Sequence, residues 1–344
     1  MYFGSIIKTA MIEAFKARLS LNAENKQRLN QINDILVDYR RQGYVLTLRQ
    51  AYYQLVSRDV IPNNAKEYAK LSDLLTKGRM AGIVDWASIE DRGRQPKLPY
   101  WVTGVKDALN DSVQQYRLNR QEGQDTYVEV CIEKDALSSI FSRVTNEYHV
   151  RLLVNKGYSS CSAMYDIYNR IAEAYDAGAK KCVILYFGDH DPSGIDMIRD
   201  VNNRVSEMLA RGHNKEKVAE LMDEAGDYLD VDDDEAEIDI SSVFTVKQLA
   251  LNMEQIRQYR PPENPAKIKD PRAKGYIAKY GNKSWELDAL RPQALAKLCK
   301  DGIESEIDME MYEKMIVKEE KQKGFITTVM EDYNEDEEDD DDES

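Results

Sequence analysis

The sequence predicts an α/β protein in which an N-terminal winged-helix domain precedes a domain built around a parallel sheet. Helical segments with basic side chains dominate the first part of the chain. From Thr126 onward, short apolar segments alternate regularly with helical ones, which is typical of a parallel α/β sheet. The last residues, "EDYNEDEEDDDDES", are nearly all polar or acidic and predict a disordered C-terminal tail.

Residues 1–93 are expected to form the winged-helix domain. Helical periodicity extends to about residue 42, and Thr47 can cap a helix that runs to Arg58. Asparagines after Pro62 can cap the next helix, "AKEYAKLSDLLTKGRMAG", and "IVDWASIED" then predicts a short strand or hairpin. Three helices followed by a β-wing describe a winged-helix domain, whose third helix would lie in a DNA groove. A small helical domain without a DNA role is the alternative. The candidate DNA-binding residues on the third helix are Lys66, Lys70, Lys77 and Arg79.

The remaining chain divides at changes in pattern. Residues 94–125 are polar and predict a linker that contains a helix. Residues 126–302 contain three strands, "TYVEVCI", "HVRLLV" and "CVILYF", each followed by a helix, and this βαβαβα order implies a parallel sheet. The acidic stretch 218–246 predicts a helix end and a solvated loop, and residues 247–300 show no clear pattern. A charged helix is expected over 303–330, and the disordered tail over 331–344.

Composition limits the class of protein. No apolar run approaches the roughly 20 residues that span a bilayer, and the four cysteines are scattered without a CxxC pair. We therefore expect a reduced, cytoplasmic protein without structural zinc or disulfides. The three histidines are also scattered, which gives little support to histidine-based metal or triad chemistry.

The net charge of −15 is unevenly distributed. Two segments, 218–246 and 331–344, each hold 11 acidic residues and no basic ones, and without them the net charge would be +7. Residues 1–100 have 16 Lys and Arg against 10 Asp and Glu. A chain with this asymmetry can bind DNA through one face, although ordinary surface charge also fits.

Three carboxylates follow the predicted strands at their carboxyl ends. Asp189 and Asp191 come just after "CVILYF", and Glu133 follows "TYVEVCI". Ligand sites of doubly wound sheets form at this edge, so the three side chains meet if the first and third strands are neighbours. Carboxylates without His or Cys suit a hard cation, most readily Mg²⁺. The alternative is a pair of solvated loop aspartates, one of which caps the next helix. Glu286 and Asp288 could add a ligand, but we expect them to be surface residues of a helix.

The segment "LRQAYYQLV" contains a candidate nucleophile. Tyr52 shares a helix face with apolar residues, so it is expected in the core. Tyr53 is turned about 100° away and lies over Arg49, one turn earlier. A phenol beside a guanidinium can attack a phosphate whose developing charge the guanidinium stabilises. The ordinary pKa near 10 makes tyrosine a weak nucleophile unless its surroundings activate it. Because the chain has 21 tyrosines, a structural role is the alternative.

Several of these motifs resemble one family. "CIEK", "NKGYSS" and "GDHDPSG" are similar to the Toprim domain of the topoisomerase VI A subunit and its meiotic double-strand-break relatives, and "LRQAYY" resembles the motif that carries their catalytic tyrosine. The likeness covers roughly residues 25–300, and a stand-alone chain of this kind resembles the solitary "mini-A" relatives of bacteria and mobile elements. It implies a Rossmann-like Toprim domain over 126–302.

The resemblance also implies a mechanism. Tyr53 would attack a DNA phosphodiester and form a 5′-phosphotyrosyl link. Glu133, Asp189 and Asp191 would hold Mg²⁺, and a homodimer on double-stranded DNA would make a staggered break. No nucleotide-binding glycine pattern appears, so ATP hydrolysis would need a separate subunit. Two alternatives remain open: a Toprim nuclease that uses metal-activated water, and a DNA-binding protein of a phage or plasmid without catalysis.

Overall fold

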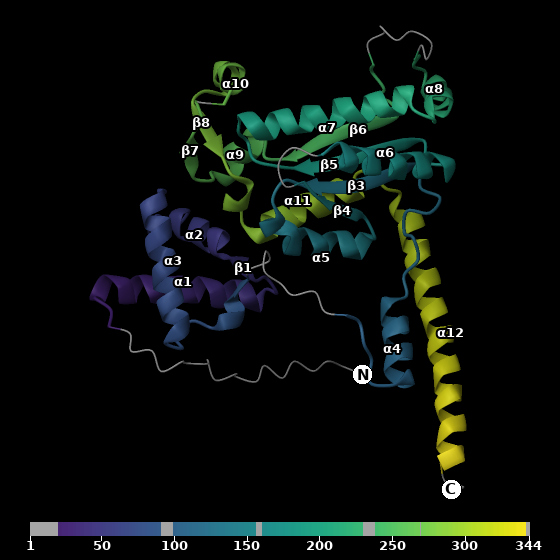
Figure 1. Ribbon diagram of the computed structural model, residues 1–344, viewed down its shortest axis with the longest axis horizontal. Helices are drawn as coiled ribbons and strands as arrows, with labels where there is room; N and C mark the ends of the chain where they lie inside the picture. Colours follow the sequence, from purple (N-terminus) through teal and green to yellow (C-terminus); the bar gives the residue numbers. More distant parts are fainter. Residues whose placement is uncertain (1–19, 91–98, 156–159, 230–237, 269, 342–344) are drawn as a thin grey trace.

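The computed structural model describes residues 20–90, 99–155, 160–229, 238–268 and 270–341, with side chains described as far as Glu331. Figure 1 shows a mainly helical N-terminal unit, a larger α/β unit and a long C-terminal helix. The mixed α/β class with a parallel sheet is as predicted.

The N-terminal unit packs three helices around one apolar cluster that includes Leu29, Leu55 and Leu71. Thr47 accepts a hydrogen bond from the Gln50 amide and completes a capping box. Both this cap and the predicted Asn64 cap are confirmed. The elements are α1 (Ala23–Arg41), β1 (Leu46–Thr47), α2 (Leu48–Val56), α3 (Ala65–Met80), a 3₁₀ turn (Trp86–Ser88) and β2 (Ile89–Glu90).

The described part of the expected wing is not a hairpin. Asp85 caps the 3₁₀ turn by accepting a hydrogen bond from the Ala87 amide, and the Arg79 guanidinium lies over the Trp86 ring at 4.4 Å. These contacts fold "DWAS" as a turn. The two-residue strand β2 that follows pairs parallel with β1. The remainder of the predicted wing lies outside the described residues.

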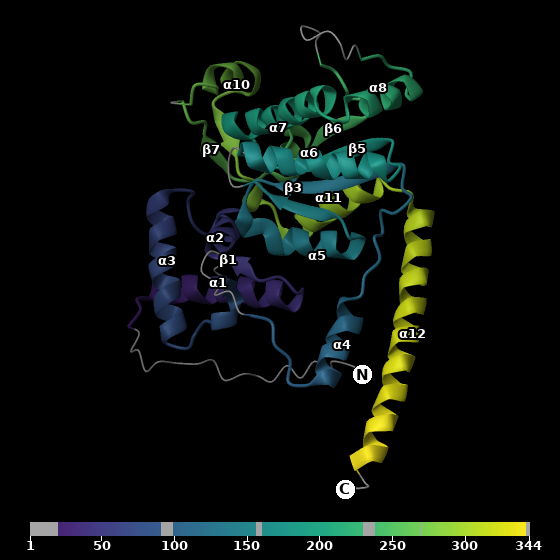
Figure 2. The same cartoon turned by 45° about the vertical axis from the view of Figure 1, so that its right-hand side comes forward.

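The predicted linker contains α4 (Val105–Gln115), which lies beside the C-terminal helix α12 (Met309–Asp341), as Figures 1 and 2 both show. Just beyond α4, the Tyr116 hydroxyl donates a hydrogen bond of 2.7 Å to Gln322. This stretch therefore packs on the C-terminal helix.

The central sheet has four parallel strands in the order β4-β3-β5-β6. The predicted strands are confirmed, and β3 and β5 are neighbours. The chain crosses from β4 over β3 to reach β5, so strand order reverses between β3 and β5, where ligand sites form in open sheets. The strands are β3 (Thr126–Ile132), β4 (Arg151–Val154), β5 (Lys181–Phe187) and β6 (Phe244–Ala250).

Helices cover both faces of the sheet and bury its alternating side chains (Figure 1). Val128, Val130 and Leu185 point into the cluster of α5 (Ser138–Tyr148) and α11 (Pro292–Glu304). Cys131 and Ile184 point into the opposite cluster, which is formed with α6 (Cys161–Asp176), α7 (Pro192–Arg211) and α8 (Lys215–Glu224). Burial of both faces explains why these strands are almost wholly apolar.

Two expectations about the acidic segments were wrong in part. Residues 244–246 belong to β6 rather than to a solvated loop, because Phe244 and Val246 pack against the sheet. In addition, α12 continues to Asp341, through most of the tail expected to be disordered. No proline follows Met309 to interrupt the helix, and glutamate is a good helix former. Among the described helices, none is both long and apolar enough to cross a membrane.

A small extension lies between β6 and α11. The antiparallel pair of β7 (Glu263–Pro265) and β8 (Lys283–Trp285) joins the carboxyl edge of the main sheet through paired hydrogen bonds between His190 and Trp285. Helices α9 (Met253–Tyr259) and α10 (Ala273–Tyr280) flank it, and a 3₁₀ turn (Leu287–Ala289) leads back to α11. This turn contacts α2 of the N-terminal unit.

Candidate active site

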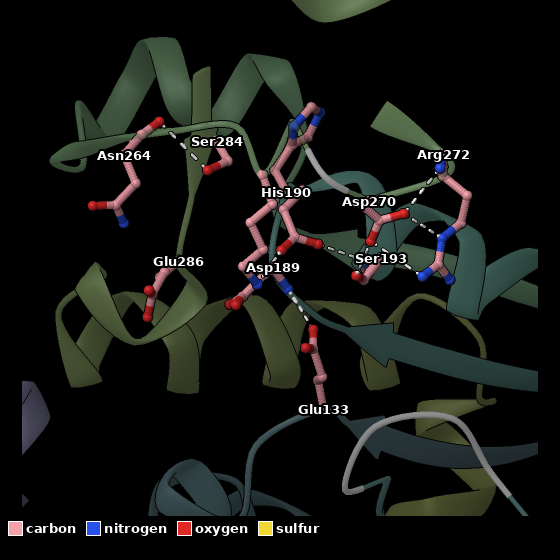
Figure 3. Close-up of polar contacts among 12 residues, drawn as sticks. Glu133, Asp189, His190, Ser193, Asn264, Asp270, Arg272, Ser284 and Glu286 are labelled. Carbon is pink, nitrogen blue, oxygen red and sulfur yellow. Dashed lines mark hydrogen bonds and ion pairs between the residues drawn. The ribbon is translucent and has the colours of Figure 1, made fainter. Parts of the chain in front are cut away.

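Glu133 and Asp189 lie together at the carboxyl edge of the sheet, as predicted. Strands β3 and β5 run in register to Ile132 and Phe187, and the Glu133 amide donates to the Phe187 carbonyl. Glu133 Oε2 accepts a hydrogen bond of 2.9 Å from the Asp189 amide, as Figure 3 shows. Adjacent strands therefore bring together two residues that are 56 positions apart.

Asp191 caps helix α7. Its Oδ1 accepts a hydrogen bond of 2.7 Å from the Gly194 amide, and its Oδ2 lies 3.1 Å from Lys267 Nζ. The helix start approaches the aspartates so closely that a Cβ at Gly194 would lie 2.2 Å from the Asp189 carbonyl oxygen. The alternative interpretation of Asp191 as a helix cap is therefore correct, but the capping residue also faces a lysine.

His190, between the two aspartates, faces away from Asp189 (Figure 3). Its ring packs against Tyr276, Tyr280 and Trp285, and its Nδ1 lies 2.7 Å from the Tyr276 hydroxyl. This contact anchors the β7–β8 extension to the end of β5. His190 therefore packs between the extension and the end of β5.

Lys134 lies at the centre of a second group of carboxylates. Its Nζ is 2.8 Å from Asp189 Oδ2, 3.0 Å from Glu286 Oε2 and 3.1 Å from Asp288 Oδ1. The Asp288 side chain is fully buried. Glu286 and Asp288 lie in this cluster, so the expectation that they are surface residues of a helix is wrong.

Burial and mutual repulsion set the ionisation of this group. Burial raises the pKa of Asp189 and that of Asp288 to about 6, despite the nearby Lys134. Burial also acts to raise the pKa of Glu286, but Lys134 and Arg49 outweigh it and lower that pKa to about 2. The pKa of Lys134 is raised, because the three carboxylates overcome the effect of its burial. At neutral pH the site is therefore a cluster of ionised carboxylates around an ammonium group.

Arg49 connects this cluster to the N-terminal unit. Its Nε lies 3.2 Å from Asp288 Oδ2, and its Nη2 pairs with Glu286. The Arg49 guanidinium also lies 6.0 Å from the centre of the Tyr53 ring. The predicted stacking of Tyr53 and Arg49 is therefore present, and it occurs at the edge of the carboxylate cluster.

Tyr52 and Tyr53 are both buried, each 4% exposed. Tyr52 is a core residue, as predicted, and its hydroxyl donates to Asn63 at 3.0 Å. Burial, followed by the charges of Glu286 and Asp288, raises the pKa of Tyr53 to about 12, although Asn264 and Arg49 act in the other direction. In this arrangement, Tyr53 is close to the carboxylates but is not activated as a nucleophile.

The four basic residues of α3 do not form an uninterrupted positive surface. Lys70 pairs with Glu67 at 2.6 Å and Lys77 pairs with Asp73 at 2.6 Å. Arg79 covers the Trp86 ring and donates to its carbonyl oxygen. Lys66 is exposed. Pairing within the helix reduces the charge that the predicted recognition helix offers to DNA.

The donor set suits Mg²⁺, although the side chains do not converge on one point. Across the described residues, no three acidic, His or Cys side chains form a metal-binding group. Glu133 faces an amide, and Asp191 faces an amide and a lysine. However, within the described part of the chain, five carboxylates lie at this edge and the cations paired there are Lys134, Lys267 and Arg49, so acidic groups outnumber basic ones. All the donors are oxygens, and a hard divalent cation would balance this charge. The five are Glu133, Asp189, Asp191, Glu286 and Asp288.

Sequence reasoning missed Lys134 and Lys267. Lys134 directly follows Glu133, so its position after a buried strand was the available signal. Lys267 lies in a stretch without a clear pattern, and its contact with Asp191 spans 76 residues. Only the fold reveals that contact.

Neither the family models nor the curated proteins searched include a match to this chain.

Proposed function

We propose that the protein is a Mg²⁺-dependent DNA-cleaving transesterase in which Tyr53 is the nucleophile. The observation that supports this most directly is the contact of Arg49 with Glu286 and Asp288, which places the Tyr53 helix against the carboxylate edge of the sheet. The proposal includes the finer fold assignment, with a winged-helix unit before a Toprim domain. The protein would act as a homodimer, and any ATP-driven step would belong to another subunit.

In the proposed reaction, Tyr53 Oη forms a bond to a backbone phosphorus and the bond from phosphorus to the 3′ oxygen breaks. The phenol gives up its proton, the 3′ oxygen leaves as a hydroxyl after gaining one, and the protein remains on the 5′ phosphate. Arg49 would hold a phosphate oxygen and stabilise its growing charge. Reversal of these steps would reseal the strand.

Glu133, Asp189 and Asp191 would hold the Mg²⁺, which when bound supplies positive charge to the scissile phosphate. Lys134 and Asp288 would keep Asp189 in place. Burial, followed by the charges of Glu286 and Asp288, raises the pKa of Tyr53, so its surroundings must change before its hydroxyl reacts. A cation bound by the carboxylates would offset the part of this effect that is due to their charge.

Burial of Tyr53 favours a second candidate, a nuclease in which water attacks the phosphate. A tyrosine that is 4% exposed with a raised pKa is consistent with a purely structural role. In that case the same carboxylates would hold the cation, and no protein would become attached to the DNA.

The two candidates differ in their cleavage products. Supercoiled plasmid is incubated with the protein and Mg²⁺, stopped with detergent, and run on a gel before and after protease treatment. The transesterase predicts broken DNA that carries protein, lost in both Tyr53→Phe and Asp189→Ala. Cleavage that persists in Tyr53→Phe without attached protein would support the nuclease. Tyr52→Phe is the matched control, because it removes only the neighbouring hydroxyl.

A further inference from the structure

A cavity of about 730 Å³ lies between the N-terminal unit and the start of α11. The segments that line it come from the end of α1, the end of α2, the end of α9 and the turn before α11. Its charged side chains are Asp38, Arg58, Arg260 and Arg291. Three guanidinium groups therefore share this cavity with a single carboxylate among the described residues.

The three arginines lack the partners that other basic residues of the protein have. Arg49, Arg120 and Arg170 all pair with carboxylates. Within the described part of the chain, no ion pair is formed by Arg58, Arg260 or Arg291, and all three are exposed. Unpaired cations in a concave surface focus positive potential there and attract anions.

The buried Tyr39 shows how close two of these cations are. Its hydroxyl donates a hydrogen bond of 2.7 Å to the buried Gln54. Burial raises the pKa of Tyr39, while the charges of Arg58 and Arg291 both act to lower it. One guanidinium from the N-terminal unit and one from the α/β unit therefore act on the same hydroxyl, and all three residues line the cavity.

The cavity and the candidate active site are built from the same two chain segments. Helix α2 carries Arg49 and Tyr53, and Arg58 follows two residues after its last residue, Val56. The turn of the α/β unit carries Asp288, and Arg291 follows three residues later. The two segments that meet at the carboxylates thus lead together into the arginine-lined cavity. A chain of phosphates extending from the site would pass along these guanidinium groups.

We propose that Arg58, Arg260 and Arg291 form a binding site for backbone phosphates of duplex DNA next to the scissile phosphate. This inference rests on the proposed function for its choice of polyanion. It differs from the expectation that α3 supplies the main DNA contacts, because Lys70 and Lys77 are neutralised by their own helix. Arginine suits the role, since its planar fork binds phosphate oxygens in pairs.

The test measures binding in a Tyr53→Phe background, so that failure of cleavage and failure of this site are separated. Binding of a short duplex is measured at several salt concentrations. Arg58→Ala/Arg291→Ala should weaken binding about tenfold and reduce the salt slope by about 2, because each lost phosphate contact removes close to one counterion. Arg291→Lys should retain most of the affinity. The matched control is Lys180→Ala/Lys217→Ala, which removes two paired surface charges away from the cavity.

Other outcomes would overturn the inference. Unchanged affinity and salt slope in the arginine variant, with an unchanged melting temperature, would exclude the site. Equal weakening in the lysine control would show a general charge effect. Inorganic pyrophosphate is the second probe. If pyrophosphate binds to the wild type but not to the arginine variant, and the duplex does not displace it, the cavity holds a small phosphate compound instead of DNA.

Discussion

Arg49 Nε lies 3.2 Å from Asp288 Oδ2, so a helix of the N-terminal unit is fastened to a fully buried carboxylate of the α/β unit. Lys134 neutralises the other oxygen of the same carboxylate at 3.1 Å. The contact joins two distant parts of the chain and sets the position of Tyr53. It is the structural basis of the proposed activity.

Removal of this contact should destabilise the fold. Arg49→Ala leaves Asp288 with Lys134 as its remaining cation, and because the Arg49 side chain is 48% exposed we expect a loss of about 1–2 kcal/mol in the free energy of unfolding. Urea unfolding measures it. Lys217→Ala, which breaks a surface pair, should change stability by less than about 0.5 kcal/mol. Equal effects of the two substitutions would show that the Arg49 contact contributes no more to stability than an exposed surface ion pair.

Mg²⁺ should stabilise the protein through Asp189. Binding to the folded state alone raises the free energy of unfolding by about 2.7 kcal/mol at roughly 100 times the Kd. Thermal unfolding with and without MgCl₂ should therefore show a rise in melting temperature that Asp189→Asn abolishes. Asp270→Asn is the control, since Asp270 lies at the same edge but pairs with Arg272. An equal rise in both variants would place the cation elsewhere.

Gly194 should tolerate no side chain. A Cβ there would lie 2.2 Å from the Asp189 carbonyl oxygen, so Gly194→Ala must push α7 away from the end of β5. We expect a loss of about 3 kcal/mol in stability together with loss of the Mg²⁺ effect. Gly275→Ala, on α10 with no atom within 4 Å, should be neutral or stabilising by about 0.5–1 kcal/mol. Normal stability of Gly194→Ala would contradict the close approach.

The buried Glu319 should make the attachment of α12 depend on pH. Burial acts to raise its pKa, but Lys323, the Leu118 amide and Arg120 outweigh it and lower the pKa to about 2. The depressed pKa means that the stabilisation is complete above about pH 4.5 and is lost as the pH falls towards 2. Glu319→Gln should therefore cost about 3 kcal/mol at pH 7, and the difference from the wild type should shrink below pH 4.5.

Urea unfolding at pH 7, 4 and 3 checks this dependence. Glu310→Gln is the control, because its side chain is 78% exposed and pairs only with Lys314. A difference between Glu319→Gln and the wild type that stays constant from pH 7 to 3 would contradict the assigned pKa.

Local signals in the sequence predicted the elements that end in caps or apolar strands. Thr47 and Asn64 begin the predicted helices, and the run up to Phe187 is the predicted strand. Since β3 and β5 are neighbours, Glu133 and Asp189 meet as expected. Edge strand β6 was missed because Lys247 and Gln248 interrupt its apolar pattern.

Long-range contacts could not be predicted in the same way. Arg49 and Glu286 are 237 residues apart, and no local pattern indicates that they pair. The same contact buries Tyr53, whose helical position alone suggested that it faces away from the core. Sequence thus identified the residue types of the site, while packing between the two units determines their environment.

The most direct test of the central claim is to identify the amino acid that becomes attached to DNA. Protein is incubated with an end-labelled duplex and Mg²⁺, denatured, digested with trypsin and nuclease, and analysed by mass spectrometry. The account predicts a peptide that contains Tyr53 and carries a nucleotide through its 5′ phosphate, absent from Tyr53→Phe and from Asp189→Ala. Efficient cleavage with no nucleotide-linked peptide, or a link at another residue, would contradict it.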